Sequence, residues 1–389
     1  MTTHRTLPHL VCLLALAACS SGERGSPGSA NTVDTTGAFP VFHARTPSMQ
    51  WHAELDAEIG ADSDGGSQFG GIRSVALGPG GIIAVLDHRT PQLVAFSADG
   101  AHTGSWGRTG SGPGEYRWPY SIAFLGDSLL LFDPGLSRIT LYDHQRRWLR
   151  EWSTPPNTGG AFVRLYQNPP GAAWVFATRA VATGLERVFI RYDSKGTSDT
   201  IPIPSYVPPP SESANCNSPD GSISFYSAPF SASLLSTPLP NRERVAAITT
   251  SYRLAFLSPD GDTVRVIERE LAPAAVSDSL WSAATAAWTE FRRRIPQAHC
   301  SRESFTRPAT IPILYSVFSD DDGRLWAEAR GNAGVVYDVF AANGEFIASV
   351  NGLPASGGTV PGVLGGRVAV VVADSLGEQR VRVYRIRQR

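Results

Sequence analysis

Lysine is almost absent from this 389-residue chain, because Lys195 is the only one and the other 33 basic residues are arginine. This argues against a phosphate-binding loop built on a Gly-Lys pair and against a lysine relay. The chain also has no excess of either charge, since 34 basic and 35 acidic residues give a net charge of -1. Such a chain should attract neither nucleic acid nor an anionic membrane surface, so we expect no nucleic-acid partner.

Motifs that carry catalysis are missing too. The sequence contains no Gly-x-Ser-x-Gly elbow, no His-Glu-x-x-His pair and no Gly-x-Gly-x-x-Gly turn that opens a helix after a strand. Histidines beyond the N-terminal segment never stand at metal-ligand spacing. Ser319–Gly323 is the nearest thing to a cation loop, but it lacks spaced ligands and a closing glutamate and is interpreted as a turn. The sequence therefore predicts no catalytic residue, no metal and no cofactor.

The N-terminal segment predicts an export signal. Leu7–Leu16 is an apolar run too short to span a bilayer, and small residues precede Cys19, as at a signal cleavage site. Leu16-Ala17-Ala18-Cys19 resembles the lipobox of bacterial lipoproteins. That resemblance implies a signal peptide over residues 1–18, lipidation of Cys19 and anchoring through the lipid. Ser20 stands where many inner-membrane lipoproteins carry Asp, which favours the outer membrane. The alternative is an ordinary signal peptide in which Cys19 is incidental.

Residues 19–40 are rich in Ser, Gly, Thr and Pro, which predicts a flexible, lipidated tether before a folded domain over 41–389. Once Cys12 in the signal and Cys19 in the anchor are set aside, only Cys216 and Cys300 remain. Two cysteines in an exported protein suggest one disulfide, and the alternative is a pair of unpaired buried thiols. Neither cysteine belongs to a Cys-x-x-Cys motif, so zinc binding and redox catalysis are not indicated.

A short alternating strand that ends in an aromatic residue recurs along the chain. A more continuous apolar run precedes each copy, and Asp-Gly, Asn-Gly or Lys-Gly follows most of them, as in tight hairpins. The interval is roughly 45 residues, lengthened by insertions, which suits the four-stranded blade of a β-propeller. The copies are Leu93–Phe96, Ile139–Tyr142, Phe189–Tyr192, Arg253–Phe256, Tyr337–Phe340 and Val381–Tyr384.

These repeats predict an all-β chain folded as a six-bladed β-propeller. The last repeat, Gly362–Arg387, supplies only three strands, and an extra alternating segment, Trp51–Ile59, precedes the first. We expect that N-terminal segment to close the ring as the outer strand of the final blade. Two packed β-sandwiches are the alternative, because short strands with Gly-rich turns fit both architectures.

Part of the chain resembles a known family. Gly107–Tyr116, which contains Gly-Pro-Gly-Glu, is followed by Pro119, Ser121-Ile122-Ala123, Phe132-Asp133 and Arg138-Ile139. These residues resemble the NHL-repeat signature of bacterial six-bladed propellers, and Asp322–Trp326 and Tyr337–Phe340 resemble later blades of the same proteins. The match is specific over residues 74–152, moderate over 312–387 and limited to the pattern between them. It implies that Gly-Pro-Gly-Glu is a structural element of the repeat and does not mark a site.

Two segments interrupt the repeats. Tyr206–Pro219 is rich in Pro and Ser and predicts a long loop. Ser277–Arg294 has apolar residues at helical spacing, with Ser277 as N-cap and Pro296 as stop. It predicts a helical insertion at about residues 275–296, between blades four and five, that packs on one face of the propeller. A disulfide between Cys216 and Cys300 would join this insertion to the earlier loop.

The expected topology suggests where a ligand would bind. In a propeller, the loops that enter each blade and those between its second and third strands gather at one face around the channel. That places Asp87, Arg89 and Asp133 near the face, together with the predicted ligand-binding residues Arg108, Glu115, Arg117, Trp118, Tyr120 and Arg138. Arginine can hold carboxylate or phosphate while an aromatic ring stacks on a sugar or apolar ring. The alternative is that these residues brace loops and that Trp118 fills a gap between blades.

The leading functional hypothesis is a non-catalytic binding module, a monomeric lipid-anchored propeller that presents a rigid face to a protein, peptide or glycan. The alternative is a channel enzyme similar to the metal-dependent lactonases or lyases found on six-bladed propellers. Those enzymes bind a divalent ion through Glu, Asn, Asp or His at the starts of inner strands. Here the inner strands begin with Ser74-Val75, Ser121-Ile122 and Ile313-Leu314, which offer few ligands. A purely structural envelope role is a third reading.

Overall fold

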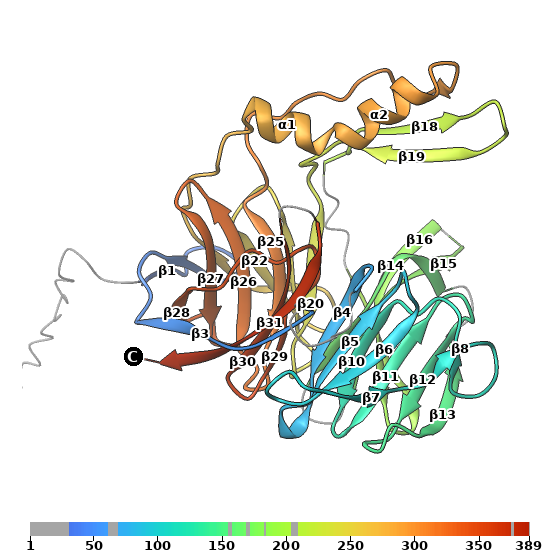
Figure 1. Ribbon diagram of the computed structural model, residues 1–389. Helices are drawn as coiled ribbons and strands as arrows, with labels where there is room; N and C mark the ends of the chain where they lie inside the picture. The colour runs from blue at the N-terminus through green and yellow to red at the C-terminus, as the bar shows by residue number, and fades with distance from the viewer. Residues whose placement is uncertain are drawn as a thin grey trace, which may run out of the picture.

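The computed structural model describes residues 31–60, 69–154, 158–168, 172–182, 184–203, 209–374 and 377–388 (Figure 1). Most of its regular structure is β-strand, as the alternating patterns predict. The signal peptide predicted at 1–18 and the lipidation predicted at Cys19 lie outside the described residues. Within the ranges above, no helix combines the length and hydropathy needed to cross a membrane.

Most strands belong to four-stranded units in which chain neighbours pair antiparallel. The first units are β4 (Ile72–Leu77), β5 (Ile83–Asp87), β6 (Gln92–Phe96) and β7 (His102–Ser105); β10 (Ser121–Leu125), β11 (Ser128–Asp133), β12 (Arg138–Tyr142) and β13 (Trp148–Ser153); and β14 (Thr158–Asn168), β15 (Ala172–Val181), β16 (Gly184–Asp193) and β17 (Gly196–Pro202). Two further units are β20 (Leu234–Pro238), β21 (Arg244–Ile248), β22 (Arg253–Leu257) and β23 (Thr263–Glu268), and β25 (Leu314–Ser319), β26 (Leu325–Gly331), β27 (Gly334–Phe340) and β28 (Phe346–Asn351). The last is β29 (Gly362–Leu364), β30 (Arg367–Ala373), β31 (Gln379–Gln388) and β3 (Met49–Ile59).

The repeated sequence pattern coincides with one position in these units. Each copy of the strand that ends in an aromatic is the third strand of its unit, and the aromatics Phe96, Tyr142, Tyr192, Phe256, Phe340 and Tyr384 are all buried. The apolar run before each copy is the second strand, and β5 is buried at every position. A strand can be apolar on both faces only when other layers cover both of them. The repeated pattern of an apolar run followed by a strand that ends in an aromatic residue therefore indicates sheets that pack face to face with their neighbours.

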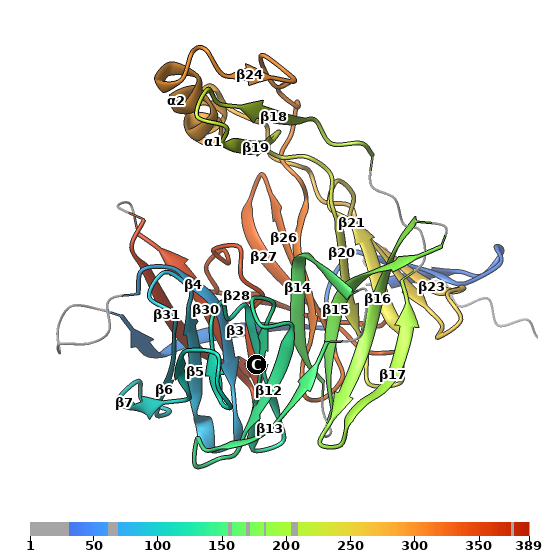
Figure 2. The ribbon, with the colours of Figure 1, turned by 90° about the vertical axis from the view of Figure 1, so that its right-hand side faces the viewer.

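The first strands of the units meet at the centre of the molecule. β10 contacts both β4 and β14, β14 contacts β20, β20 contacts β25, and β29 contacts β4. Four-stranded antiparallel sheets stacked around a shared centre, with the first strand innermost, form a β-propeller. Figure 2 shows the sheets side by side, with a separate group of strands and helices standing above them.

The N-terminal strands run along the outer edges of the sheets. β3 pairs antiparallel with β31, from Trp51 opposite Gln388 to Ile59 opposite Val381, and pairs in parallel with β28. One continuous eight-stranded sheet results. β2 (Val41–Ala44) pairs in parallel with β23, and β1 (Asn31–Asp34) pairs antiparallel with β2. The flexible tether predicted for residues 19–40 therefore does not hold for β1, whose backbone is held by the adjacent strand although its side chains are mostly exposed.

Complementary charges reinforce the pairing of β3 with the C-terminal strands. Arg387 donates to Glu54 at 2.9 Å, and Arg385 and Arg367 donate to Asp56 at 3.1 and 2.8 Å. Glu58 accepts from Arg382 and, at 3.4 Å, from Arg380. Arg367 is 8% exposed and also donates to the carbonyl oxygens of Gly81 and Ala98 in the first unit. This guanidinium therefore ties the last unit, β3 and the first unit together.

The group above the sheets is built from two separate interruptions of the repeat. The first contributes β18 (Ser213–Asn217) and β19 (Ile223–Ser227), and the second contributes α1 (Asp278–Ala284), α2 (Ala286–Arg294) and β24 (His299–Cys300). We call this group the insertion. β18 lies inside the predicted loop Tyr206–Pro219, so the loop prediction is wrong for Ser213–Asn217, where pairing with β19 and β24 satisfies the backbone.

The predicted helix is present but is interrupted. The hydroxyl of Ser277 accepts from the backbone N–H of Leu280 at 3.1 Å, as an N-cap does. At Thr285 the helix divides, and the Thr285 hydroxyl donates to the carbonyl of Trp281 at 2.8 Å. The helices pack on the β18–β19 hairpin rather than directly on a propeller sheet. Their shared core contains Ala214, Cys216, Tyr226, Ala228, Trp281, Trp288, Phe291, Cys300 and Phe305.

The predicted disulfide between Cys216 and Cys300 is confirmed. These two residues face each other in the pairing of β18 with β24, and the bond closes a stretch with a sequence separation of 84 residues. It joins the segment before the β20 sheet to the segment after it. The covalent link therefore holds the two halves of the insertion together where their apolar core is small.

Removing the Asp56 carboxylate should destabilise the protein more than removing that of Glu54. Asp56→Ala leaves the buried Arg367 without its anionic partner, at a cost of about 1–3 kcal/mol. Glu54→Ala breaks a half-exposed pair with Arg387, worth about 0.5 kcal/mol. Urea unfolding of both variants measures the difference, and equal losses would show that Arg367 does not depend on Asp56.

Acid should weaken the same contact. Partial burial alone would raise the pKa of Asp56, but Arg385 and Arg367 hold that pKa below its ordinary value of 3.8. The stability that this carboxylate contributes is therefore complete above pH 3.8 and is lost as the pH falls through the lower folded-state pKa. The difference in stability between wild type and Asp56→Ala should shrink over that range.

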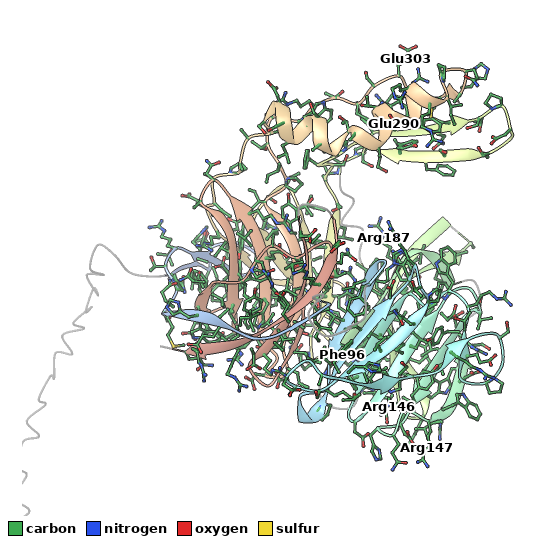
Figure 3. The ribbon with its side chains drawn as sticks, in the orientation of Figure 1. Phe96, Arg146, Arg147, Arg187, Glu290 and Glu303 are labelled. Carbon is green, nitrogen blue, oxygen red and sulfur yellow. A yellow bond between two sulfur atoms is a disulfide. The ribbon has the colours of Figure 1, made fainter. Side chains whose placement is uncertain are left out.

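Breaking the disulfide should loosen the insertion and leave the sheets intact. In a Cys216→Ser, Cys300→Ser double variant, trypsin should cleave faster after the arginines at 292–294, because a cross-link of this span contributes about 2–5 kcal/mol. Cleavage after Arg147, at the edge of the sheets far from the insertion (Figure 3), serves as the control and should not change. Alkylation of both cysteines in the folded protein without reductant would contradict the bond.

Candidate functional site in the central cavity

Two adjoining cavities occupy the centre where the first strands meet. Each has a volume of about 530 Å³, and both are lined by Tyr120, Arg164, Tyr166 and Val360. The first cavity extends along β4, β10 and the segment 357–363, and the second extends along β15, β20 and β25. Cavities of 300–1,000 Å³ are typical of small-molecule sites. We call the two together the central cavity.

Among the described residues that line the central cavity, the charged groups are all basic. Arg73 lines the first part, Arg187 lines the second and Arg164 lines both, and His88 is the only other ionisable base among these described residues. No Asp or Glu is among the described residues that line either part. The cavity therefore concentrates positive charge in a chain whose net charge is -1.

These arginines also differ from the others in their partners. Across the residues that the structure describes, no carboxylate lies within ion-pair distance of Arg73, Arg164 or Arg187, whereas most other arginines have one. The Arg73 guanidinium lies over the Tyr120 ring, 4.6 Å from its centre, and its Nε is buried without a hydrogen-bond partner. The ring fixes the guanidinium in place but does not neutralise its charge.

Tyr166, which also lines the cavity, is affected by burial and by the nearby Arg164. Burial raises the pKa of Tyr166, and the nearby Arg164 guanidinium opposes that shift. The Tyr166 ring also packs edge-on against Phe189, at 5.6 Å between ring centres. Tyr166 therefore has a neutral hydroxyl group and a fixed ring at physiological pH.

Figure 3 shows Arg187 at the edge of the sheets that faces the insertion, where Glu290 and Glu303 are labelled.

His88 is held by a close approach to the backbone. Its Nδ1 lies 2.6 Å from the carbonyl oxygen of Gly71. Because a carbonyl only accepts, Nδ1 must carry the proton, which leaves Nε2 as the second site for a proton. A side chain at position 71 would place its Cβ 2.5 Å from His88 Cε1, so the contact requires glycine there. The imidazole is therefore locked in one orientation at the cavity wall.

Two serine residues in the lining of the first cavity, Ser74 and Ser121, have a structural role. Ser74 Oγ accepts from the backbone N–H of Ile122 at 3.3 Å, and Ser121 Oγ accepts from that of Leu165 at 2.9 Å. Each hydroxyl thus links one first strand to the next. These serines stand at equivalent positions in successive units, which explains why the sequence repeats them.

Of the predicted ligand-binding residues, only Tyr120 lines the central cavity. Arg108 has an 82% exposed side chain and pairs with Glu115 at 2.8 Å, across the short parallel strands β8 (Arg108–Thr109) and β9 (Glu115–Tyr116). Arg138 is largely buried, pairs with Glu151 at 3.0 Å and donates to the carbonyl oxygens of Gly112 and Glu115. Arg108, Glu115 and Arg138 therefore brace the loop of the NHL-like segment.

The remaining predicted residues of that face lie near two different sheets: Arg117, Trp118 and Asp133 belong to the β10 sheet and its entry loop, and Asp87 and Arg89 to the β4 sheet. The backbone N–H groups of Arg117 and Trp118 donate to the buried carboxylate of Asp133 at 2.6 and 3.2 Å, and Asp87 accepts from those of Gly70, Gly71 and Arg89 in the same way. Arg117 donates from its side chain to Ser111 at 2.9 Å. Trp118 is 56% exposed, so it does not fill a gap between sheets. These hydrogen bonds hold the connections to their own sheets.

Two of the cavity arginines lie one position away from features that are visible in the sequence. Arg73 immediately precedes the strand start Ser74-Val75, just as Tyr120, which the sequence predicted, precedes Ser121-Ile122. Arg164 stands one residue before Leu165, which pairs with Ser121. An arginine directly before a linking serine, or before the residue that the serine binds, is therefore the signal that marks Arg73 and Arg164, whereas no such signal marks Arg187.

The residues present do not form a metal centre. Among the described His, Cys, Asp and Glu side chains, no group of three lies close enough to hold an ion. The Asp320 carboxylate accepts from the backbone N–H of Arg324 and from the indole of Trp326, both at 2.8 Å. Burial raises the pKa of Asp320. Ser319–Gly323 is thus a turn held by the protein's own donors, as interpreted from the sequence.

Comparison with known proteins finds only distant structural similarity. No protein-family profile and no curated protein sequence matches the chain. Among solved structures, a protein of Bacteroides fragilis named as exported is 10% identical, with a TM-score of 0.45 over 90% of this chain and 99% of that one. Virginiamycin B lyase from Staphylococcus aureus is 11% identical, with a TM-score of 0.41 over 86% of this chain and 99% of that one. Similarity at this level carries no conclusion about function.

Asp133 should matter for stability and Arg108 should not. Asp133→Ala removes a buried carboxylate and leaves the part-buried backbone N–H groups of Arg117 and Trp118 without an acceptor, which should cost about 1–3 kcal/mol. Arg108→Ala removes an exposed pair and should cost less than about 1 kcal/mol. Thermal or urea unfolding measures both. A large loss from Arg108→Ala would show that the loop depends on the exposed pair.

Proposed function

We propose that this protein is a lipid-anchored, extracytoplasmic six-bladed β-propeller that binds a ligand in its central cavity without catalysis. The observation that carries the proposal is a preformed central cavity lined by first strands from separate sheets, with basic and aromatic side chains and no described carboxylate. Its ligand is the end of a protein, peptide or glycan, or a molecule of similar size.

The ring of six blades rests on the strand pairings. β3 completes the last unit by pairing with β31, and β29 of that unit contacts β4 of the first. Arg367 adds a polar link across the same junction. A ring closed by strands from both ends of the chain resists opening, because separating the ends would expose two sheet edges. The helical insertion follows the fourth unit and precedes the fifth.

The proposed location rests on the N-terminal sequence and on the disulfide. Leu16-Ala17-Ala18-Cys19 resembles a lipobox, and Ser20 favours the outer membrane. Disulfides persist in oxidising compartments outside the cytoplasm, and the Cys216–Cys300 bond holds a small core that has little other support. Both features indicate the same side of the membrane.

The lining gives a binding role preference over a metal-dependent lactonase-like or lyase-like activity. A divalent ion needs several carboxylate, amide or imidazole ligands in one place, whereas the described lining offers His88 and Gln167 amid three arginines. Guanidinium groups repel a cation and attract an anion. The side chains present therefore do not fit a catalytic metal.

A cavity-filling variant tests the proposal. Val360 lines both parts of the central cavity, so Val360→Trp should fill the space that they share. Partners captured from envelope extracts by the wild-type protein should be lost from this variant and kept by an Arg108, Arg117 and Trp118 triple alanine variant. Far-UV circular dichroism checks that each variant folds. Identical capture by wild type and Val360→Trp would refute cavity binding, and a stoichiometric divalent ion that resists dialysis would favour the enzyme.

A further inference from the structure

We propose that the central cavity selects an organic anion, with a carboxylate or phosphate group bound by Arg164 between Arg73 and Arg187 and an apolar body beside it. This inference deepens the proposed function, on which it rests, by naming the ligand class. It follows from three features of the cavity: its uncompensated charge, the arrangement of its arginines and the division of its walls into polar and apolar parts.

These arginines lack a counter-charge within the described lining. Arg73 and Arg164 are half-buried, whereas Arg187 is exposed. Elsewhere in the described chain, the largely buried Arg138 and Arg265 pair with Glu151 and Glu243, although the buried Arg244 has no ion pair. A half-buried guanidinium without an anion is costly because it has lost water without gaining a counter-charge. The described lining of the cavity contributes no carboxylate, so an anion from solution is the natural partner of Arg73 and Arg164.

The arrangement of the arginines makes Arg164 the central one of the three. Arg164 borders both parts of the cavity, Arg73 approaches from β4 on one side, and Arg187 approaches from β16 on the other. Arg73 is already oriented by the Tyr120 ring, and its buried Nε has no partner. Guanidinium groups form paired hydrogen bonds with carboxylate and phosphate oxygens, which a carbonyl or hydroxyl group cannot match.

The walls indicate what accompanies the anionic group. The second part of the cavity is bordered by Phe176, Leu234, Leu235 and Val317 as well as by Arg164 and Arg187. The apolar side chains provide a surface for a ring or short hydrocarbon chain, and about 530 Å³ accommodates such a group. A carboxylate or phosphate attached to an apolar body would contact both the arginines and the apolar side chains. Inorganic phosphate would contact only the arginines.

Matched probes test the class of ligand. Benzoate, phenyl phosphate, inorganic phosphate and neutral benzyl alcohol are titrated into the purified wild-type protein by calorimetry at constant ionic strength. Benzoate and phenyl phosphate should bind, benzyl alcohol should bind at least about tenfold more weakly because it cannot engage the arginines, and inorganic phosphate should be weaker than phenyl phosphate. Equal affinity for benzoate and benzyl alcohol would overturn the anion, and equal affinity for the two phosphates would overturn the apolar body.

Arginine variants locate the binding. Arg164→Gln should weaken benzoate binding about 10- to 100-fold, since a charge-assisted hydrogen bond contributes that much, and Arg73→Gln and Arg187→Gln should each weaken it less. Arg164→Lys should recover part of the loss because it keeps the charge. Arg45→Gln removes an exposed arginine outside the cavity lining and should change nothing. Unchanged binding in a folded Arg164→Gln protein would overturn the assignment.

These results are separable from those of the proposed function. If Val360→Trp abolishes partner capture while no anion binds to the wild type, the cavity is a binding site for a neutral ligand and the anion inference alone fails. If benzoate binding survives in a folded Val360→Trp protein, the anion binds elsewhere and the inference fails on location. Thermal unfolding of each variant shows whether the fold is retained.

Discussion

The pairing of β3 with β31 is the contact on which the rest of the structure depends. It joins residue 51 to residue 388 through a backbone ladder, and the alternating acids of β3 meet arginines of the C-terminal strands along it. Arg367 extends the junction to the first unit, where its remaining donors reach Gly81 and Ala98. Without this junction the first and last sheets would each have a free apolar face, because no blade is thick enough to bury both faces alone.

Closure of the sheets determines the site. The first strands are brought together only because every sheet packs on two neighbours, and the polar atoms at their ends are then used in two ways. Ser74 and Ser121 connect adjacent strands, while Arg73, Tyr120 and Arg164 beside them remain at the cavity wall. The conspicuous Gly-Pro-Gly-Glu loop lies outside this centre, where Arg138 and Asp133 hold it against its own sheet. Repetition in the sequence therefore marks structure, and the functional candidates lie between the repeated positions.

The insertion shows how a propeller gains an element without disturbing its sheets. Both of its segments occupy connections that enter a unit, one before β20 and one before β25, so neither interrupts a strand ladder. Each segment alone would have little to bury, but together they enclose Trp288, Phe305 and the Cys216–Cys300 bond. The β18–β19 hairpin could not be recognised locally, because its stability depends on α2 and β24, which lie far along the chain.

Sequence alone determined the strand periodicity, the repeat positions, the helix over 277–294 and the cysteine pair, because each depends on local spacing or on simple counting. Tertiary structure decided the break at Thr285, the strand at Asn31–Asp34 and the identity of the cavity residues. These depend on which segments become neighbours in space. The sequence predicted Arg108 and Arg138 as ligand-binding residues, yet both have carboxylate partners. Arg73 and Arg164 have no such partner within the described chain. Only the packing of the sheets separates an arginine that braces a loop from one that lines the central cavity.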